Sequence, residues 1–202
     1  YAKGLPRWED CEAAASEIQS IDEKRADLEL QYSDLSGEPG VTTEQLDALL
    51  AEIDACTAEI NLKKAALKAD VELIVNFVKY HFQDNSVYVD NLPHSIVEGE
   101  EVKYVVKYET AALDEVTKRF SAVTVQTQNG TISVKGDIDE IDNTCYVNNA
   151  EGTEGILHNI MTRDIEFSSQ NIETSSYAVV HQIDGFLVNS RIFDATTQTF
   201  IK

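Results

Sequence analysis

Residues 35–46 read LSGEPGVTTEQL, and this stretch separates two regions of helical periodicity. Pro39 and the glycine after it cannot continue a helix, and Gly37 suits a helix end. Thr42, followed three residues later by Gln45, has the pattern of a capping box that begins a new helix. The stretch therefore predicts a tight connection between two helices.

On each side of this loop, mostly apolar residues alternate steps of three and four, which is the heptad spacing of a coiled coil. The first series is Cys11, Ala14, Ile18, Ile21, Arg25, Leu28, Tyr32 and Leu35, and the second is Leu46, Leu49, Ile53, Cys56, Ile60, Lys63, Leu67 and Asp70. The two series are mirror images about the loop, so antiparallel pairing places Leu28 beside Ile53. We predict an antiparallel helical hairpin over residues 8–35 and 43–82. A parallel trimer of helices that break at the loop is the alternative.

The second predicted helix ends in a strongly apolar segment. Residues 71–82 read VELIVNFVKYHF, with apolar side chains nearly all round the helix, a pattern typical of an end buried on several sides. Two helices alone also leave one flank of each apolar stripe open. We therefore expect the apolar helix end to be embedded in the second domain or in an oligomer. We also expect packing against other protein subunits, in a homo-oligomer or a larger assembly.

After residue 82 the composition shifts to Thr, Ser, Asn, Val, Ile and Tyr, and the apolar period becomes two. Strands are expected at residues 86–90, 101–109, 120–128, 131–138, 144–147, 164–168, 177–183 and 186–193. Asn129-Gly130 and Asp184-Gly185 each have the sequence of a two-residue hairpin turn. Residues 111–118 are expected to form a helical insertion, and residues 148–155 an exposed loop.

These patterns together predict an α+β fold. The chain has 202 residues, 43% of them apolar, which is enough for one large domain or two small ones. We expect an N-terminal antiparallel helical hairpin, or coiled-coil stalk, at residues 1–82. A mostly antiparallel β-rich domain is expected at residues 83–202.

The charge of the chain argues against several partners. Sixteen Lys and Arg residues stand against 36 Asp and Glu, which gives a net charge of −20 at pH 7. This charge repels nucleic-acid phosphates and anionic lipid head groups, so we expect neither nucleic-acid nor membrane partners. No apolar run could span a bilayer and residues 1–10 do not resemble a signal peptide, so we expect a soluble protein in a virion or the cytoplasm. Position 1 is not Met and the only methionine is Met161, so we expect a processed product or a segment of a longer chain.

One acidic stretch is a candidate metal site. Asp137, Asp139 and Asp142 follow a predicted strand, and their carboxylates could ligate Ca²⁺ through hard oxygens. The stretch lacks the spacing of an EF-hand loop, and a solvated acidic turn is the alternative. No other cofactor is expected.

No catalytic motif is present, and we expect the chain not to be an enzyme. It lacks a GxSxG elbow, a Walker loop, GxGxxG and HExxH, and its histidines, His81, His94, His158 and His181, lack zinc-ligand spacing. Cys11 and Cys56 fall on the heptad seam, so only Cys145 is conceivable as a nucleophile. The strand tyrosines could pack across strands or line a binding face, and both readings stay open: Tyr88, Tyr104, Tyr108, Tyr146 and Tyr177.

A heptad region followed by a Thr-, Ser- and Asn-rich β module resembles the plan of bacteriophage tail, neck and fibre proteins and other virion structural proteins. The resemblance implies a structural protein that mediates assembly or attachment, and no motif transfers functional residues. The plan is also similar to that of bacterial transcript cleavage factors. That likeness implies a regulator that inserts its hairpin into RNA polymerase and presents Asp34, Glu38 and Glu44 at the tip. A chaperone-type clamp on the same hairpin is a third possibility.

Overall fold

The structure, a computed structural model, describes residues 4–83, 87, 92, 103–128, 131–147, 160–166, 175–181 and 183–201. The chain forms two compact units that divide inside the second helix, between Val75 and Asn76. The first unit is a helical hairpin, and the second contains the strands. The predicted α+β fold is confirmed.

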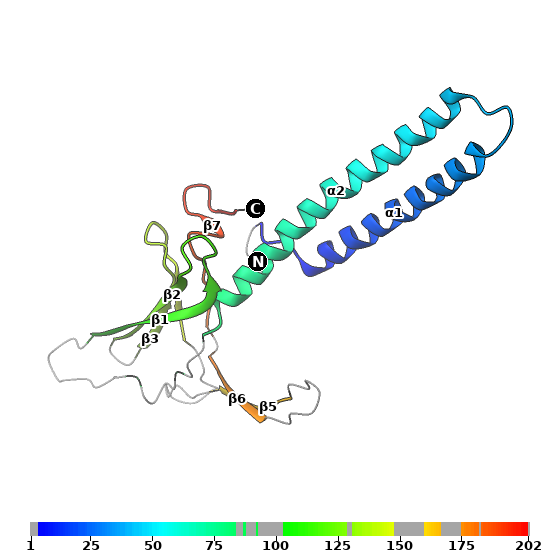
Figure 1. Cartoon of the computed structure of the whole chain (residues 1–202). Coiled ribbons are helices and arrows are strands. Elements are labelled where there is room, and N and C mark those ends of the chain that lie inside the picture. Colours follow the sequence, from blue (N-terminus) through cyan, green and yellow to red (C-terminus); the bar gives the residue numbers. More distant parts are fainter. Residues whose placement is uncertain are drawn as a thin grey trace. The chain divides into compact units, whose positions relative to one another are not determined.

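The first unit contains α1 (Trp8–Ser36) and most of α2 (Thr43–Tyr80), which run side by side in opposite directions (Figure 1). The predicted capping box starts α2. The Thr42 N–H donates to Gln45 Oε1 at 3.1 Å, and the Gln45 N–H donates to Thr42 Oγ1 at 3.3 Å. At the end of α1, the Gly37 N–H donates to the Asp34 carbonyl at 3.3 Å. Both helix boundaries at the loop therefore follow from local sequence.

The heptad seam is the core of the hairpin. In α1, every predicted seam residue is buried or half-buried and every other residue is exposed. Lys63, one of the charged interruptions, reaches across to Glu17, with Nζ 2.9 Å from the carboxylate. Arg25 stays on its own helix, 2.8 Å from Asp22. The antiparallel hairpin is confirmed.

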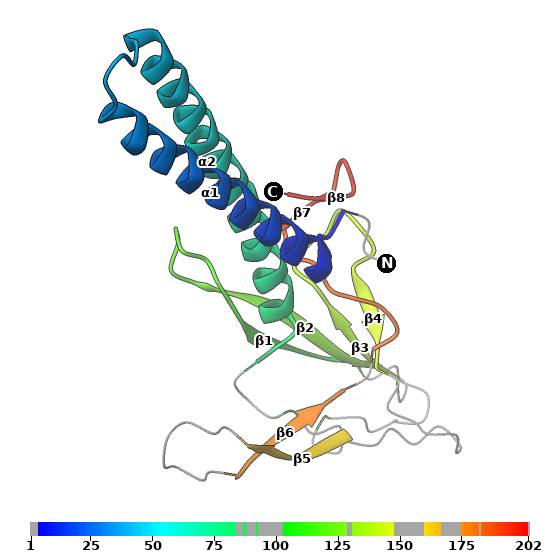
Figure 2. The ribbon, with the colours of Figure 1, turned by 90° about the vertical axis from the view of Figure 1, so that its right-hand side faces the viewer.

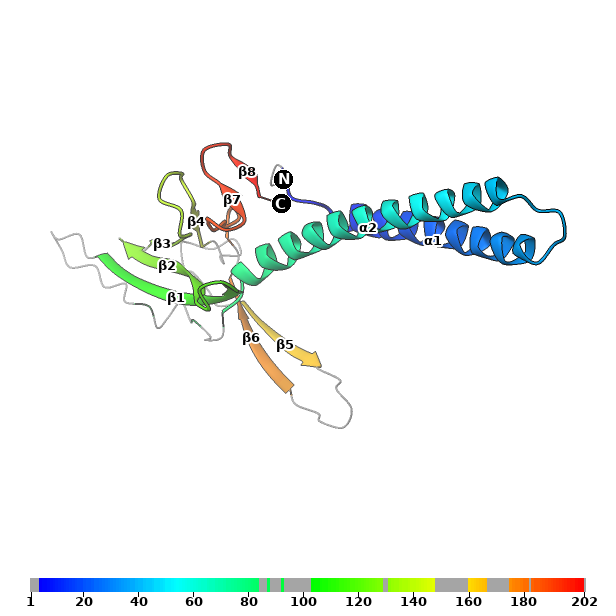
Figure 3. The same ribbon diagram turned by 45° about the horizontal axis from the view of Figure 1, so that its top comes forward.

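The second unit is built on a four-stranded antiparallel sheet in the order β1-β2-β3-β4 (Figure 2). Its strands are β1 (Lys103–Leu113), β2 (Phe120–Gln128), β3 (Thr131–Lys135) and β4 (Thr144–Tyr146). Two separate strand pairs follow, β5 (Ile160–Glu166) with β6 (Ser175–Val180) and β7 (Phe193–Asp194) with β8 (Thr199–Phe200) (Figure 3).

The core of the second unit lies on one face of this sheet and includes the last turn of α2. Two clusters of buried residues make it up, Tyr80 with Ala112, Val123, Cys145 and Leu187, and Leu92 with Val125, Ile132 and Val147. The Tyr80 hydroxyl donates to the Ala122 carbonyl at 3.0 Å and accepts from the Asp137 N–H at 2.9 Å. The helix end is buried in the second unit at Tyr80, whereas Val78 and Phe82 are 46% and 63% exposed in the single chain.

The expected helical insertion at residues 111–118 is wrong. Residues 111–113 continue β1, and a turn follows. In this turn, Asp114 Oδ1 accepts from the N–H groups of Val116 and Thr117 at 2.8 and 2.9 Å, and Lys118 has φ of 56°. The Asp114 side chain caps a single turn, in which the Lys118 N–H donates to the Asp114 carbonyl at 2.7 Å. The Asp114 N–H donates to the Arg119 carbonyl at 2.8 Å, so the chain reverses into β2 instead of continuing as a helix.

The expected Asp184-Gly185 hairpin is also wrong. Asp184 instead bonds to Tyr146, donating its N–H to the carbonyl at 3.1 Å and accepting the Tyr146 N–H on Oδ1 at 2.7 Å. The neighbouring Ile183 forms a bridge with Val147. Of the strand expected at residues 186–193, only the end at Phe193 is extended and paired.

The remaining strand predictions differ mainly in their ends. β2 matches the expected range, β3 stops at Lys135, and β5 and β6 begin earlier than expected. Asn129-Gly130 lies outside the described residues, but Gln128 pairs with Thr131, as a two-residue hairpin requires. Apart from Val87, the strand expected at 86–90 and the loop expected at 148–155 also lie outside them.

Candidate interaction surface

The outer edge of β1 is the candidate functional surface. β1 lies at one end of the sheet, and among the described residues β2 is the only strand that pairs with it. Three consecutive apolar side chains on this strand are exposed, Tyr104 by 37%, Val105 by 54% and Val106 by 38%. Exposed apolar edge strands attract further strands, and native proteins usually charge or cover them.

The register of the sheet shows which backbone groups of β1 point outward. The two-residue connection makes Gln128 and Thr131 a hydrogen-bonded pair, so alternate β2 residues bond to β3 and the others to β1. The β2 residues that bond to β1 are the odd-numbered ones, and their partners are the even-numbered residues of β1, as in the pair Val106–Val125. The N–H and C=O groups of the odd-numbered residues therefore point away from the sheet, at Val105, Lys107 and Glu109.

This free edge ends at Ala111. The Ala111 N–H donates to the Phe82 carbonyl at 2.7 Å, which occupies the outward side of β1 at that point. The pairing with β2 also shifts between Glu109 and Leu113. The side chain of Thr110 stabilises the irregular stretch, because Oγ1 donates to the Ser121 carbonyl at 2.9 Å and accepts the Ala112 N–H at 3.2 Å. Among the described residues, none pairs with the outward side of residues 103–109, and this is the part of β1 on which an added strand could pair.

The two faces of this edge differ in chemistry. The even-numbered residues Tyr104, Val106 and Tyr108 lie on the core face, and Tyr108 packs against both buried clusters. The odd-numbered face presents Val105, Lys107 and Glu109, which are all exposed. An arriving strand would meet outward backbone groups that no described strand pairs with, an apolar face and a mixed charged face, which are the elements of strand addition.

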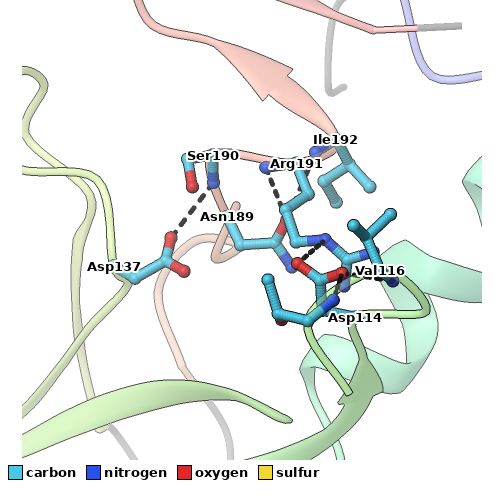
Figure 4. Close-up of polar contacts among 8 residues, drawn as sticks. Asp114, Val116, Asp137, Asn189, Ser190, Arg191 and Ile192 are labelled. Carbon is cyan, nitrogen blue, oxygen red and sulfur yellow. Dashed lines mark hydrogen bonds and ion pairs between the residues drawn. The ribbon is translucent and has the colours of Figure 1, made fainter. Parts of the chain in front are cut away.

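Two of the three aspartates predicted as a metal site have partners of their own. Asp137 Oδ1 accepts the Ser190 N–H at 3.1 Å (Figure 4), Asp139 Oδ1 lies 2.6 Å from Lys135 Nζ, and Asp142 is exposed. Burial raises the pKa of the Asp137 carboxyl, whereas the hydrogen bond from Lys135 lowers the pKa of Asp139. Within the described residues, no three His, Cys, Asp or Glu side chains are grouped to hold a metal ion.

A cluster of polar contacts near Asp137 holds the segment that precedes β7 (Figure 4). Asn189 is 1% exposed, and its Oδ1 accepts the N–H groups of Arg191 and Ile192 at 3.1 and 3.2 Å. The Arg191 guanidinium lies 3.3 Å from the Asp114 carboxylate. These contacts satisfy backbone groups in a segment without regular pairing, which is a structural role.

Asn143 also holds the segment that precedes β7, through the backbone of Val188. It is 4% exposed; its amide donates to the Val188 carbonyl at 2.5 Å, and its oxygen accepts the Val188 N–H at 3.2 Å. The side chain thus replaces a strand partner for Val188. The sequence analysis did not single out Asn143 or Asn189, because neither their type nor their spacing marks them apart from other polar residues in the β-rich region.

The described histidines and cysteines are engaged in packing. His81 Nε2 accepts the Leu187 N–H at 3.0 Å, and His181 Nε2 lies 2.6 Å from the Val87 carbonyl. Cys145 is 4% exposed in the core, where burial raises the pKa of its thiol and so disfavours the reactive thiolate. Cys11 and Cys56 are both buried, each 5% exposed, as the seam predicts.

The sequence analysis named part of the candidate surface. Tyr104 and Tyr108 belong to it, and Tyr146 is 52% exposed on β4. Tyr88 and the side chain of Tyr177 lie outside the described residues. Val105 and Val106 were missed, although the run Tyr-Val-Val breaks the alternation of a half-buried strand and is a signal for exposed apolar surface.

No family model, curated protein or solved structure matches the chain. Within the described part of the chain, neither helix has an apolar stretch long enough to cross a membrane.

Proposed function

We propose that the chain is a structural subunit that binds other protein subunits through the free edge of β1. The observation that carries this proposal is the exposed run Tyr104-Val105-Val106 on a strand whose odd-numbered backbone groups point outward. Exposed apolar edges of this kind attract further strands, and no described strand covers the outward side of β1, so a subunit that binds there is the partner that this surface fits.

The proposed setting is a virion, in a tail, neck or fibre. The supporting feature is the plan of the molecule, a coiled-coil hairpin followed by a unit of antiparallel strands. Such assemblies need rigid extended elements and strand edges that join subunits, and the chain supplies both. Its role is assembly or attachment rather than catalysis.

Mass spectrometry of gradient-purified particles from cells that produce the chain tests this proposal. We expect the chain in the particles at a fixed ratio to the other structural proteins. Its absence from the particles, with recovery instead on RNA polymerase, would replace the proposal with the hairpin-inserting regulator.

A further inference from the structure

We propose that the partner of the β1 edge is the β1 edge of a second copy of this chain, paired antiparallel about a two-fold axis at Val106. This inference rests on the proposed function, because it names the partner of the same surface. It would join two four-stranded sheets into one continuous sheet.

Backbone geometry limits the possible registers. An added strand must meet the outward N–H and C=O groups of the odd-numbered residues, so odd-numbered residues must face odd-numbered residues of the second copy. A two-fold axis at Val106 meets this condition and pairs the whole open stretch, residues 103–109. Val105 then faces Lys107 of the second copy in a hydrogen-bonded pair, and Val106 faces its own copy in a non-hydrogen-bonded pair.

Charge selects this register over its neighbours. With the axis at Val106, the positions of Lys103 and Glu109 face each other at both ends of the pairing. Moving the axis to Val105 places Lys103 opposite Lys107. Moving the axis to Lys107 places Lys107 opposite Lys107 of the second copy. Like charges directly opposite each other destabilise antiparallel pairs, so β1 is complementary to itself in the Val106 register.

The apolar face supports the same register. Tyr104 would face Tyr108 of the second copy, which places one aromatic pair on each side of the central valine pair. Tyr104 and Val106 are more than one-third exposed in the single chain, whereas Tyr108 already packs on the core. Pairing therefore extends each core face across the junction and covers the side chains that the single sheet leaves open.

Light scattering of the full chain, with variants at matched valines, tests the interface. We expect twice the chain mass of 22.5 kDa for the unmodified protein and the single-chain mass for Val106→Lys, which places two ammonium groups together at the axis. Val116→Lys is the control, because Val116 is 92% exposed in the turn after β1 and lies outside the pairing. It should keep the double mass. A cooperative thermal melt and a native-like circular dichroism spectrum will show that both variants fold, although loss of the dimer should itself lower the melting temperature of Val106→Lys.

Disulfide trapping tests the register. Non-hydrogen-bonded partners in antiparallel strands bring their Cα atoms to about 4.5 Å, within the range of a disulfide. Val106→Cys should therefore form a covalent dimer under mild oxidation, whereas Val105→Cys, which faces Lys107, should not. The native cysteines, Cys11, Cys56 and Cys145, are buried at 5%, 5% and 4% exposure and so are poorly accessible to an oxidant. Equal cross-linking of both variants would overturn the register.

A charge exchange gives a third readout. Glu109→Lys alone should weaken the dimer, and adding Lys103→Glu should restore it. A partner other than a second copy would not be rescued by this exchange, so failure of the rescue overturns the inference. A monomeric native chain, or a dimer unaffected by Val106→Lys, also overturns it.

The outcomes separate this inference from the proposed function. If the chain is found in particles but Val106→Lys does not change its mass in solution, the structural role is supported and the two-fold pairing is rejected. A chain that dimerises through Val106 but is absent from particles removes the virion role and leaves the pairing.

Discussion

The Lys63 ammonium lies 2.9 Å from the Glu17 carboxylate, so one ion pair joins the two helices of the hairpin. Glu59, on the same helix as Lys63, is farther away at 3.8 Å. The hydrogen bond to Glu17 is the main cause that raises the pKa of the Lys63 amine. The pair fixes a point of contact that only the antiparallel arrangement explains.

Reversing one charge of this pair should lower the melting temperature slightly, because both groups are largely in solvent and exposed pairs contribute little. We expect Glu17→Lys to melt below the native chain and Glu17→Lys with Lys63→Glu to recover most of the loss. Thermal melts in a double-mutant cycle measure the coupling. Purely additive losses would contradict direct contact between the two side chains.

Tyr80→Phe should destabilise the second unit. The buried Tyr80 hydroxyl bonds to the Ala122 carbonyl and to the Asp137 N–H, and the variant leaves both groups without this partner. Loss of a buried partner costs about 1–3 kcal/mol, which denaturant unfolding can measure. Tyr146→Phe is the matched control; because Tyr146 is 52% exposed, its change should stay within about 0.5 kcal/mol.

Gly136→Ala should also destabilise this unit, because the added methyl group has no space. A Cβ at Gly136 would overlap the side-chain amide of Asn143 and lie 2.7 Å from the Val188 carbonyl oxygen. Overpacking of this kind costs about 1–3 kcal/mol. Gly37→Ala is the control, since the nearest atom to its Cβ would be the Asp34 carbonyl oxygen at 3.7 Å. Equal melting temperatures for the two variants would refute the crowding at Gly136.

The second unit should lose stability when the pH falls from 7 to 5, through His81. Nε2 accepts the Leu187 N–H, so the ring is neutral and its proton is on Nδ1, which donates to the Phe77 carbonyl at 2.9 Å. Burial is the main cause that lowers the pKa of His81 from its ordinary value of 6.5. The unfolded chain therefore takes up this proton first. The stabilisation that neutral His81 contributes is complete above pH 6.5, the ordinary pKa of the unfolded chain's histidine. It is lost as the pH drops toward the lower pKa of the folded state.

Denaturant unfolding at several pH values measures this dependence. His81→Ala should be less stable at pH 7 and should show a smaller decrease between pH 7 and pH 5 than the native chain. Parallel decreases in both proteins would assign the pH dependence to other groups.

Calcium should not bind at the acidic turn with measurable heat. The Lys135 ammonium lies 2.6 Å from Asp139 Oδ1 and competes with a cation for that oxygen, while Asp137 is engaged with the Ser190 N–H. We expect calorimetry at millimolar Ca²⁺ to show no heat, and the melting temperature to be the same with a chelator. A calcium-dependent rise in melting temperature that Asp139→Asn abolishes would establish the site instead.

The hairpin could be predicted from sequence because its determinants are local and periodic. Heptad spacing, the Pro39 break and the Thr42 cap are each visible within a few residues, and the seam needs only the partner that follows the loop. The strand at residues 120–128 was also predictable, because it alternates cleanly beside a two-residue turn.

The errors arose where distant residues decide local structure. The segment after Ala111 has helix-forming residues, but pairing with β2 and the positive φ of Lys118 limit it to a single turn. Asp184 has a hairpin-turn sequence, yet its carboxylate binds Tyr146, far along the chain. The candidate surface depends on which strand lies at the edge of the sheet. Strand order is a property of the whole topology that no local pattern encodes.

The exposed loop between the two helices is a site where an inserted tag should be tolerated. Pro39 lies at its centre, and Thr42 and Gln45 begin α2 by contacts that do not involve residues 36–40. Doubling the length of a flexible loop costs only about 0.6 kcal/mol in closure entropy. An epitope tag or a small fluorescent reporter inserted after Pro39 should therefore leave the hairpin folded, which would allow the chain to be followed by microscopy without modifying β1.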